Sequence, residues 1–150
     1  HISRSQTGRN TRILLGASMG GYGALVHAMK DTEQYRAVGA FSPATVWAKD
    51  LEEKVGHKFP EPMDLYQIIR DDVDAGKKLP DIFFCVGNND FLIESVDRFE
   101  EYLNELKIDH RFDRVDGYEH EWRFWELELP EFLDWLPRTD SYAKMGKHKM

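Results

Sequence analysis

The segment Gly16-Ala17-Ser18-Met19-Gly20 places a serine between two glycines, after a short apolar run and before a helical pattern. A sharp strand-to-helix turn strains its central residue and brings the flanking positions together, so bulky side chains at positions 16 and 20 would clash. The turn lifts the serine hydroxyl above the sheet and leaves the Met19 N–H at the helix N-terminus, where it can stabilise an oxyanion. The spacing therefore predicts a nucleophile elbow with Ser18 as the nucleophile.

Two other interpretations of this glycine-rich turn are a turn that only packs tightly and a turn that binds a nucleotide phosphate. The dinucleotide-binding pattern needs a third glycine where the chain has Val26, after Gly21-Tyr22-Gly23. The P-loop pattern also fails, because no Gly-Lys-Ser or Gly-Lys-Thr follows. The glycine spacing thus argues against nucleotide binding.

A serine hydroxyl is a weak nucleophile unless a histidine takes its proton and a carboxylate orients that histidine. On a strand–turn–helix architecture the acid follows the serine in the chain and the histidine comes last, each in a loop after a later strand. Asp90 follows the strand predicted to end at Val86, and it is the predicted acid. Glu94 is the local rival, and an ordinary turn or helix-capping role for Asp90 is the alternative.

Six histidines are candidates for the general base. His120 is predicted to lie in a loop between the last strand and the last helix, which is where the base belongs. The other five fall at the chain ends, inside a helix, in an irregular segment or at the start of a strand: His1, His27, His57, His110 and His148. His120 is therefore the predicted base, with a surface histidine between Glu119 and Glu121 as the alternative.

Strands and helices that alternate along the chain must position these residues. Apolar runs predict strands over 11–16, 37–41, 81–87 and 111–115, the last near a sheet edge. Helical spacing predicts helices over 20–30, 63–70, 94–107 and 122–136, with a kink or break at Pro130. This order predicts an α/β fold with a mostly parallel sheet and helices on both faces.

The chain has 150 residues, of which 41% are hydrophobic and 13% aromatic, enough for one domain with a real core. We expect a catalytic unit over 1–137, with an irregular insertion or lid at 47–79, and a polar tail at 138–150. The formal net charge of −7 argues against nucleic acid as a partner. No stretch is long enough for a membrane span.

Cysteine is used once, so the chain has no internal disulfide and no multi-cysteine metal site. Cys85 lies inside the strand predicted over 81–87, and we expect a small buried hydrophobe there rather than a nucleophile. The candidate pocket residues are aromatic and lie near the predicted site, although aromatics at this density are also usual in a core. They are Trp47, Phe91, Tyr118 and Trp122.

Three segments resemble the esterase D group of α/β-hydrolases: 16–24, 87–92 and 117–125. That group includes S-formylglutathione hydrolases, tributyrin and acetyl esterases, and feruloyl and acetylxylan esterases, with antigen 85-type mycolyltransferases more distant. The resemblance runs from about Arg9 to Leu136. It is more specific than the serine motif alone because His120 is followed by tryptophans in a His-x-Trp-x-x-Trp pattern.

The resemblance implies a serine carboxylesterase with Ser18 as nucleophile, His120 as general base and then acid, and Asp90 as the orienting acid. It implies no metal and no cofactor, and it suggests short-chain acyl, acetyl or feruloyl esters as substrates. An acyltransferase with the same triad is one alternative. The other is a catalytically incomplete fragment or pseudoenzyme that acts as a binding module.

A whole α/β-hydrolase domain has roughly 200–250 residues, whereas this chain opens with His1 just before the serine's strand. We therefore expect the C-terminal portion of such a domain, without the early strands and the loop that supplies the second oxyanion donor. The apolar residues 13–15 would then form an exposed strand edge, through which the isolated chain is expected to self-associate. Localisation is left open, with the cytoplasm favoured.

Overall fold

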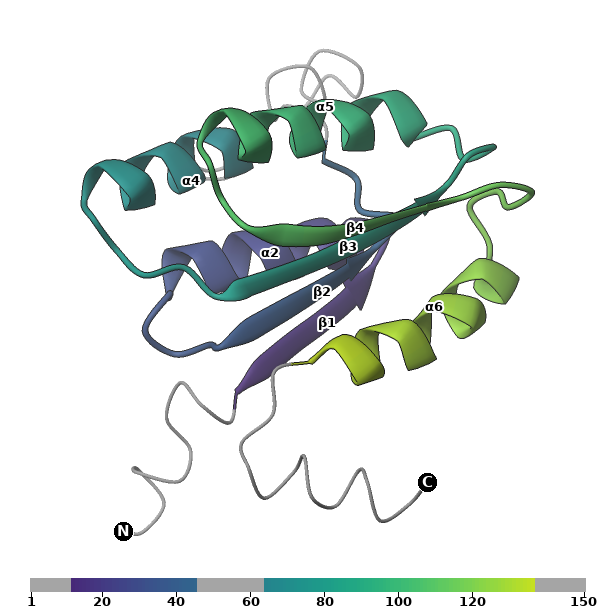
Figure 1. The fold of residues 1–150 in the computed structure, drawn as a ribbon, viewed down its shortest axis with the longest axis horizontal. Helices are drawn as coiled ribbons and strands as arrows, with labels where there is room; N and C mark the ends of the chain where they lie inside the picture. Colours follow the sequence, from purple (N-terminus) through teal and green to yellow (C-terminus); the bar gives the residue numbers. More distant parts are fainter. Residues whose placement is uncertain (1–11, 46–63, 137–150) are drawn as a thin grey trace, which may run out of the picture.

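The computed structural model describes residues 12–45 and 64–136 (Figure 1). In these residues all the strands pair in parallel, in the order β1-β2-β3-β4. The predicted α/β fold with a mostly parallel sheet is confirmed. The elements are β1 (Ile13–Ala17), α2 (Met19–Lys30), β2 (Ala37–Phe41), α4 (Leu65–Asp74), β3 (Asp81–Gly87), α5 (Ile93–Glu105), β4 (His110–Val115) and α6 (Trp122–Trp135).

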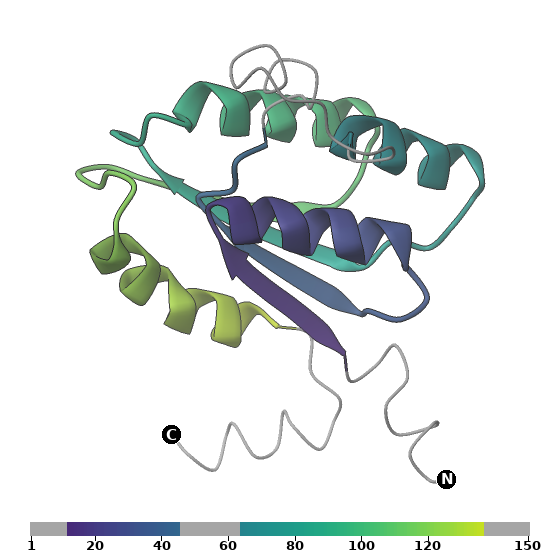
Figure 2. The ribbon, with the colours of Figure 1, turned by 180° about the vertical axis from the view of Figure 1, so that it is seen from behind.

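The sheet is the middle of three layers, with α2, α4 and α5 on one face and α6 on the other (Figures 1 and 2). Successive side chains of a strand point to opposite faces, and β3 shows the consequence. Ile82, Phe84 and Val86 join the core beneath α2, α4 and α5, whereas Phe83 and Cys85 join the core beneath α6. All five side chains are fully buried, as expected of a strand covered on both faces.

The two ends of the described sheet differ from this buried centre. At one end is β4, as its alternating sequence predicted. At the other is β1, where Ile13 is 37% exposed and Leu15 is 46% exposed. The apolar face of β1 on the α6 side is thus only partly covered by the described residues.

Helix α4 begins and ends later than the spacing predicted. Asp64 is its N-cap, and its carboxylate accepts hydrogen bonds from the backbone N–H groups of Tyr66 and Gln67 at 3.0 and 3.3 Å. The cap sets the start at Leu65 rather than Met63, and the helix continues past Arg70 to Asp74. Residues 47–63 of the predicted insertion at 47–79 and all of the predicted tail at 138–150 lie outside the described residues.

Helix α6 runs unbroken through Pro130, so of the predicted kink or break the break is wrong. The proline ring removes one backbone N–H and one intrahelical hydrogen bond. Buried side chains on both sides of it, Phe124 and Phe132, hold the helix against the sheet. None of the helices in the described ranges is long and apolar enough to cross a lipid bilayer.

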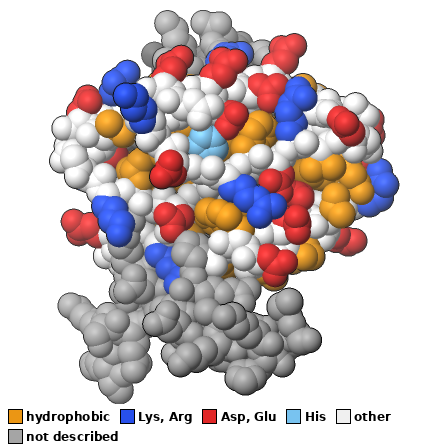
Figure 3. All heavy atoms as spheres, viewed as in Figure 1, with side chains coloured by type: hydrophobic (Ala, Val, Ile, Leu, Met, Phe, Trp, Pro, Cys, Tyr) orange, Lys and Arg blue, Asp and Glu red, His pale blue; other side chains and the backbone are white. Residues whose placement is uncertain are grey.

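Charged side chains of both signs lie close together on the face shown in Figure 3, with apolar patches between them. Two arginines of β4 illustrate how the charges pair. Arg111 binds Asp113 at 2.9 Å, and Arg114 binds Asp97 of α5 at 3.0 Å. These partly exposed pairs lie along the β4 end of the sheet and each contributes little to stability.

Candidate active site

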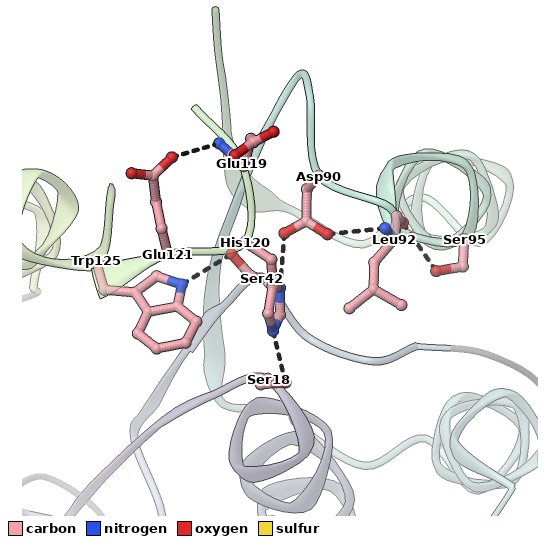
Figure 4. Close-up of polar contacts among 9 residues, drawn as sticks. All are labelled: Ser18, Ser42, Asp90, Leu92, Ser95, Glu119, His120, Glu121 and Trp125. Carbon is pink, nitrogen blue, oxygen red and sulfur yellow. Dashed lines mark hydrogen bonds and ion pairs between the residues drawn. The ribbon is translucent and has the colours of Figure 1, made fainter. Parts of the chain in front are cut away.

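The structure brings the three residues Ser18, Asp90 and His120 together at one edge of the sheet (Figure 4). Nε2 of His120 lies 2.8 Å from Oγ of Ser18, and Nδ1 of His120 lies 2.8 Å from Oδ2 of Asp90. Each residue follows a strand: Ser18 follows β1, Asp90 follows β3 and His120 follows β4. Parallel strands end at the same edge, which is how residues 102 positions apart in the sequence come into contact.

Ser18 occupies a strained turn between β1 and α2, with φ 56° and ψ −123°. Left-handed backbone of this kind is costly for any residue other than glycine. Backbone hydrogen bonds hold it in place: the Ser18 N–H donates to Phe41 O at 2.9 Å, and its carbonyl accepts from Ala44 N–H at 3.2 Å. The carbonyl also accepts from Gly21 and Tyr22 in the first turn of α2. The end of β2 and the start of α2 therefore fix the serine.

Close packing requires glycine at one of the two predicted positions of this turn. A Cβ atom on Gly16 would lie 2.2 Å from the carbonyl oxygen of Gly20. A Cβ on Gly20 itself would meet nothing within 4 Å, so the expected clash at position 20 is wrong. The reason is that Gly20 is already a helical residue of α2 with its side-chain position facing outward, whereas Gly16 faces the helix.

We expect Gly16→Ala to destabilise the fold by about 1–3 kcal/mol, because the added methyl overlaps backbone that cannot move freely. Gly23→Ala, in the middle of α2, is the matched control. Its Cβ would meet nothing within 4 Å, so alanine should stabilise the helix by about 0.5–1 kcal/mol. Urea unfolding of the two variants measures both effects, and changes of the same sign would contradict this account of the turn.

Met19 directly follows Ser18 and is the first residue of α2. The first N–H groups of a helix have no acceptor within it, and they lie at the positive end of the helix dipole. The Met19 N–H is thus available beside the serine, and the Met19 side chain is 55% exposed.

Asp90 uses each of its carboxylate oxygens for a different partner. Oδ1 accepts the Leu92 N–H at 2.8 Å, and Oδ2 faces His120. An ionised carboxylate only accepts, so Nδ1 of His120 carries the proton between them. The side chain is completely buried. Asp90 therefore supports the turn into α5 and also contacts His120, whereas its rival Glu94 is exposed in the first turn of α5.

The loop that carries His120 packs tightly on the end of β3. A Cβ atom on Gly87 would lie 2.2 Å from the carbonyl oxygen of Tyr118, which accepts the Asn89 N–H at 2.9 Å. The carboxylate of the neighbouring Glu121 accepts hydrogen bonds from the Glu119 N–H and from the Arg123 guanidinium. These hydrogen bonds lower the pKa of the Glu121 carboxyl. Its contacts therefore point away from His120.

Two aromatic rings flank His120. The centre of the Phe91 ring lies 5.0 Å from the centre of the imidazole. The centre of the Trp125 ring lies 5.3 Å from it, at an interplanar angle of 89°. The indole N–H of Trp125 donates to Oγ of Ser42 at 2.9 Å. Sequence reasoning missed Ser42, which lies 83 positions before its partner.

A cavity of about 220 Å³ lies beside the elbow, between β1 and α6. Of the predicted pocket residues, Trp122 lines it, and Phe91 is 78% exposed beside His120. Tyr118 instead packs on Phe124 under the guanidinium of Arg123, and Trp47 lies outside the described residues. The lining residues are Leu15, Gly16, Ala17, Phe41, Trp122, Trp125, Glu126 and Leu129.

Cys85 is fully buried in β3. Burial raises the pKa of its thiol well above the usual value, and Glu128, which is ionised at the high pH where such a thiol titrates, acts in the same direction. A thiol kept in its neutral form is a poor nucleophile. The position therefore fits a core hydrophobe, as expected.

The chain matches the family model described as "Putative esterase" over residues 1–136. A curated relative, an acetyl esterase of Caldicellulosiruptor saccharolyticus, is 24% identical over 152 residues, which cover 89% of this chain and 57% of that protein.

Solved structures match at similar levels of identity. The S-formylglutathione hydrolase FrmB of Staphylococcus aureus has a TM-score of 0.72 and 21% identity, over 86% of this chain and 52% of that one. A ferulic acid esterase has a TM-score of 0.69 and 22% identity, and the match covers 83% of this chain and 50% of that one. The chain thus spans about half the length of these relatives, and the predicted resemblance is confirmed. The chain belongs to this esterase family and has the α/β-hydrolase fold.

Proposed function

We propose that this chain carries the nucleophile, base and acid of a carboxylic ester hydrolase that works through an acyl-enzyme. One observation carries the proposal: the continuous line of hydrogen bonds from Ser18 through His120 to Asp90, with both distances 2.8 Å. A neutral imidazole whose Nδ1–H is held by a carboxylate presents a free lone pair at Nε2 to the serine hydroxyl. Family membership supports the ester class.

In the first half of the reaction, Oγ of Ser18 attacks the ester carbonyl carbon while Nε2 of His120 takes the hydroxyl proton. The carbonyl π electrons move to the oxygen, and the Met19 N–H stabilises the resulting oxyanion. When the carbonyl re-forms, the bond to the leaving oxygen breaks and His120 returns its proton to the alcohol. The acyl group is then an ester of Ser18.

In the second half, water attacks the same carbonyl carbon and gives its proton to His120. The second oxyanion collapses, the bond to Oγ breaks and Ser18 recovers its proton from the imidazolium. Asp90 stays ionised throughout and stabilises the imidazolium that forms in each half. The carboxylic acid leaves as product.

The substrates proposed are short-chain acyl, acetyl or feruloyl esters. Support comes from the apolar cavity beside the elbow, in which Trp122 and Phe41 can contact an apolar acyl group. In this fold a second oxyanion donor comes from a loop before the serine's strand, and the described residues assign only the Met19 N–H. Turnover depends on both donors, each typically contributing about 10²–10³ in rate, so we choose a first test that does not need full turnover.

Covalent labelling tests the proposal directly, because phosphonylation needs an activated serine and not full turnover. The purified chain is treated with a fluorophosphonate and its intact mass is measured. We expect one adduct per chain, and none in Ser18→Ala. Labelling that persists in a Ser18→Ala variant with an unchanged melting curve would contradict the assignment, as would a folded wild-type chain that takes no label.

We also propose that the isolated chain self-associates through the edge of β1. The support is the exposure of Ile13 and Leu15 on a strand with no neighbour on that side among the described residues. Sedimentation velocity is expected to show oligomers, and Leu15→Lys should shift them toward monomer because a charge on the edge opposes pairing. A monomeric wild-type chain over the whole concentration range would rule this out.

A further inference from the structure

Two hydrogen bonds do not fully orient the imidazole of His120. His120 lies between β4 and α6, outside any helix or strand. The ring is attached through Cγ and turns about the Cβ–Cγ bond. Its bond to Asp90 opposes this turn from Nδ1, but its bond to Ser18 is given up when Oγ attacks the substrate. Other contacts with the ring therefore also determine how Nε2 is aimed.

Of the two aromatic rings beside His120, only that of Trp125 carries a polar group, and a hydrogen bond holds it in place. Phe91 is 78% exposed, and the centre of its ring lies 5.0 Å from that of the His120 ring. Trp125 is half-buried, and its indole N–H is bound to Oγ of Ser42. Figure 4 shows the indole extending from α6 beside His120, with its nitrogen directed at Ser42. The anchored side of the imidazole is therefore the Trp125 side.

Ser42 has an unusual backbone for a residue with a side chain. Its φ of 47° lies in the left-handed region, where glycine is favoured and other residues are strained. It is fully buried, and its N–H donates to Cys85 O at 2.8 Å. Unlike glycine, serine has a hydroxyl, and here its Oγ accepts the hydrogen bond from the indole N–H of Trp125. Strain of this kind persists where the surrounding contacts require it, often at functional sites.

The same short segment also fixes the nucleophile. Residues on either side of Ser42 bind the backbone of Ser18: Phe41 O accepts its N–H at 2.9 Å, and Ala44 N–H donates to its carbonyl at 3.2 Å. Residues 41–44 thus hold Ser18 through the backbone and Trp125 through a side chain. The same four residues therefore position both Ser18 and the indole that lies beside His120.

We propose that Ser42 and Trp125 are positioning residues for His120. The Ser42 hydroxyl fixes the indole, the indole limits rotation of the imidazole, and Nε2 stays aimed at Oγ of Ser18. The inference rests on the proposed function of Ser18 as nucleophile. Neither residue gives or takes a proton in the reaction.

Two variants and one matched control test this inference. Ser42→Gly removes the hydroxyl and relieves the backbone strain, so it separates the lost contact from general destabilisation. Trp125→Phe removes the indole N–H and keeps an aromatic ring. Trp135→Phe makes the same change on the same helix, but Trp135 packs on Phe83 and Phe132, with ring centres 5.5 and 5.9 Å apart.

The fluorophosphonate reaction of the full chain is followed by intact mass at several reagent concentrations. We expect Ser42→Gly and Trp125→Phe to lower the limiting labelling rate constant by about 10–100-fold. The half-saturating concentration should change little in Ser42→Gly, because Ser42 does not line the cavity. The downfield NMR signal of the His120 Nδ1 proton should broaden or disappear in both variants. Trp135→Phe should change neither readout.

Wild-type labelling rates together with an unchanged Nδ1 signal in both variants would overturn the inference. An equal loss in Trp135→Phe would also overturn it, because the effect would then be general loosening of α6. If the wild-type chain takes no label, the proposed function fails and the NMR signal alone decides. A signal lost in Ser42→Gly and Trp125→Phe but kept in Trp135→Phe then supports the positioning role, and any other pattern contradicts it.

Discussion

Asp90→Asn is expected to slow phosphonylation of Ser18 by about 10³–10⁴-fold while leaving the fold in place. The replacement is nearly the same size and stays hydrogen-bonded, so the loss comes from the protonation pattern of His120. The two partners of the wild-type carboxylate explain why. Leu92 N–H and His120 Nδ1–H both donate to it, at 2.8 Å each.

An asparagine has only one oxygen for these two donors. The Leu92 N–H is a fixed backbone donor beside a completely buried side chain, so leaving it unpaired is costly. The amide oxygen therefore serves Leu92, and the amide NH₂ faces Nδ1. Nδ1 must then accept, the imidazole proton moves to Nε2, and Nε2 can no longer take the proton of Ser18.

Asp97→Asn is the matched control. Asp97 lies on α5 and pairs with Arg114 at the surface, so the same substitution there should leave the labelling rate unchanged. Rate constants from intact-mass time courses give the comparison. An Asp90→Asn rate within tenfold of wild type would show that the orientation of His120 does not depend on this carboxylate.

The sequence was sufficient to place Ser18, Asp90 and His120 in one region because each of them follows a strand. Strand ends are visible as apolar runs, and parallel strands bring their ends to the same edge whatever their separation in the chain. The order of the three residues then left few alternatives. Only the structure separates Asp90 from Glu94, because Asp90 contacts His120 whereas Glu94 lies in the first turn of α5 and is exposed.

The contacts around these residues could not be read from spacing. Ser42 follows a buried strand like any strand-ending serine, and nothing local reveals its positive φ or its bond to Trp125. Gly87 looks like a simple strand terminus, whereas its missing Cβ makes room for the carbonyl of Tyr118. Both depend on how distant loops pack, and the helical or strand period of a segment carries no such information.

Glu128 is another residue whose environment the sequence concealed, since a glutamate in a helix normally faces solvent. It lies in α6, is 3% exposed, and faces Asp113 of β4. Burial, together with the contact to Asp113, raises the pKa of Glu128 to about 8 from its ordinary value of 4.5. Burial also opposes ionisation of Asp113, but hydrogen bonds from Arg111 and Glu128 outweigh it and lower the pKa of Asp113.

The protonation of Glu128 makes the stability of the fold depend on pH in a definite direction. Between about pH 4.5 and pH 8 the folded chain holds a proton on Glu128 that the unfolded chain has released. Stability contributed by this group is therefore largest at the acidic end of the window and is lost as the pH rises through 8. The other charges facing it, Glu131 and Arg111, partly offset each other.

We expect Glu128→Gln to remove this dependence, because a neutral amide keeps a donor for Asp113 and cannot ionise. Between about pH 5 and about pH 9, wild-type stability should fall by roughly 3–4 kcal/mol more than that of the variant. Urea unfolding at both pH values measures the difference, with the exposed Glu126→Gln on the same helix as control. If the free energy of unfolding changes equally with pH in the wild type and in Glu128→Gln, Glu128 is already ionised in the folded chain. Helix α6 would then pack over a buried negative charge.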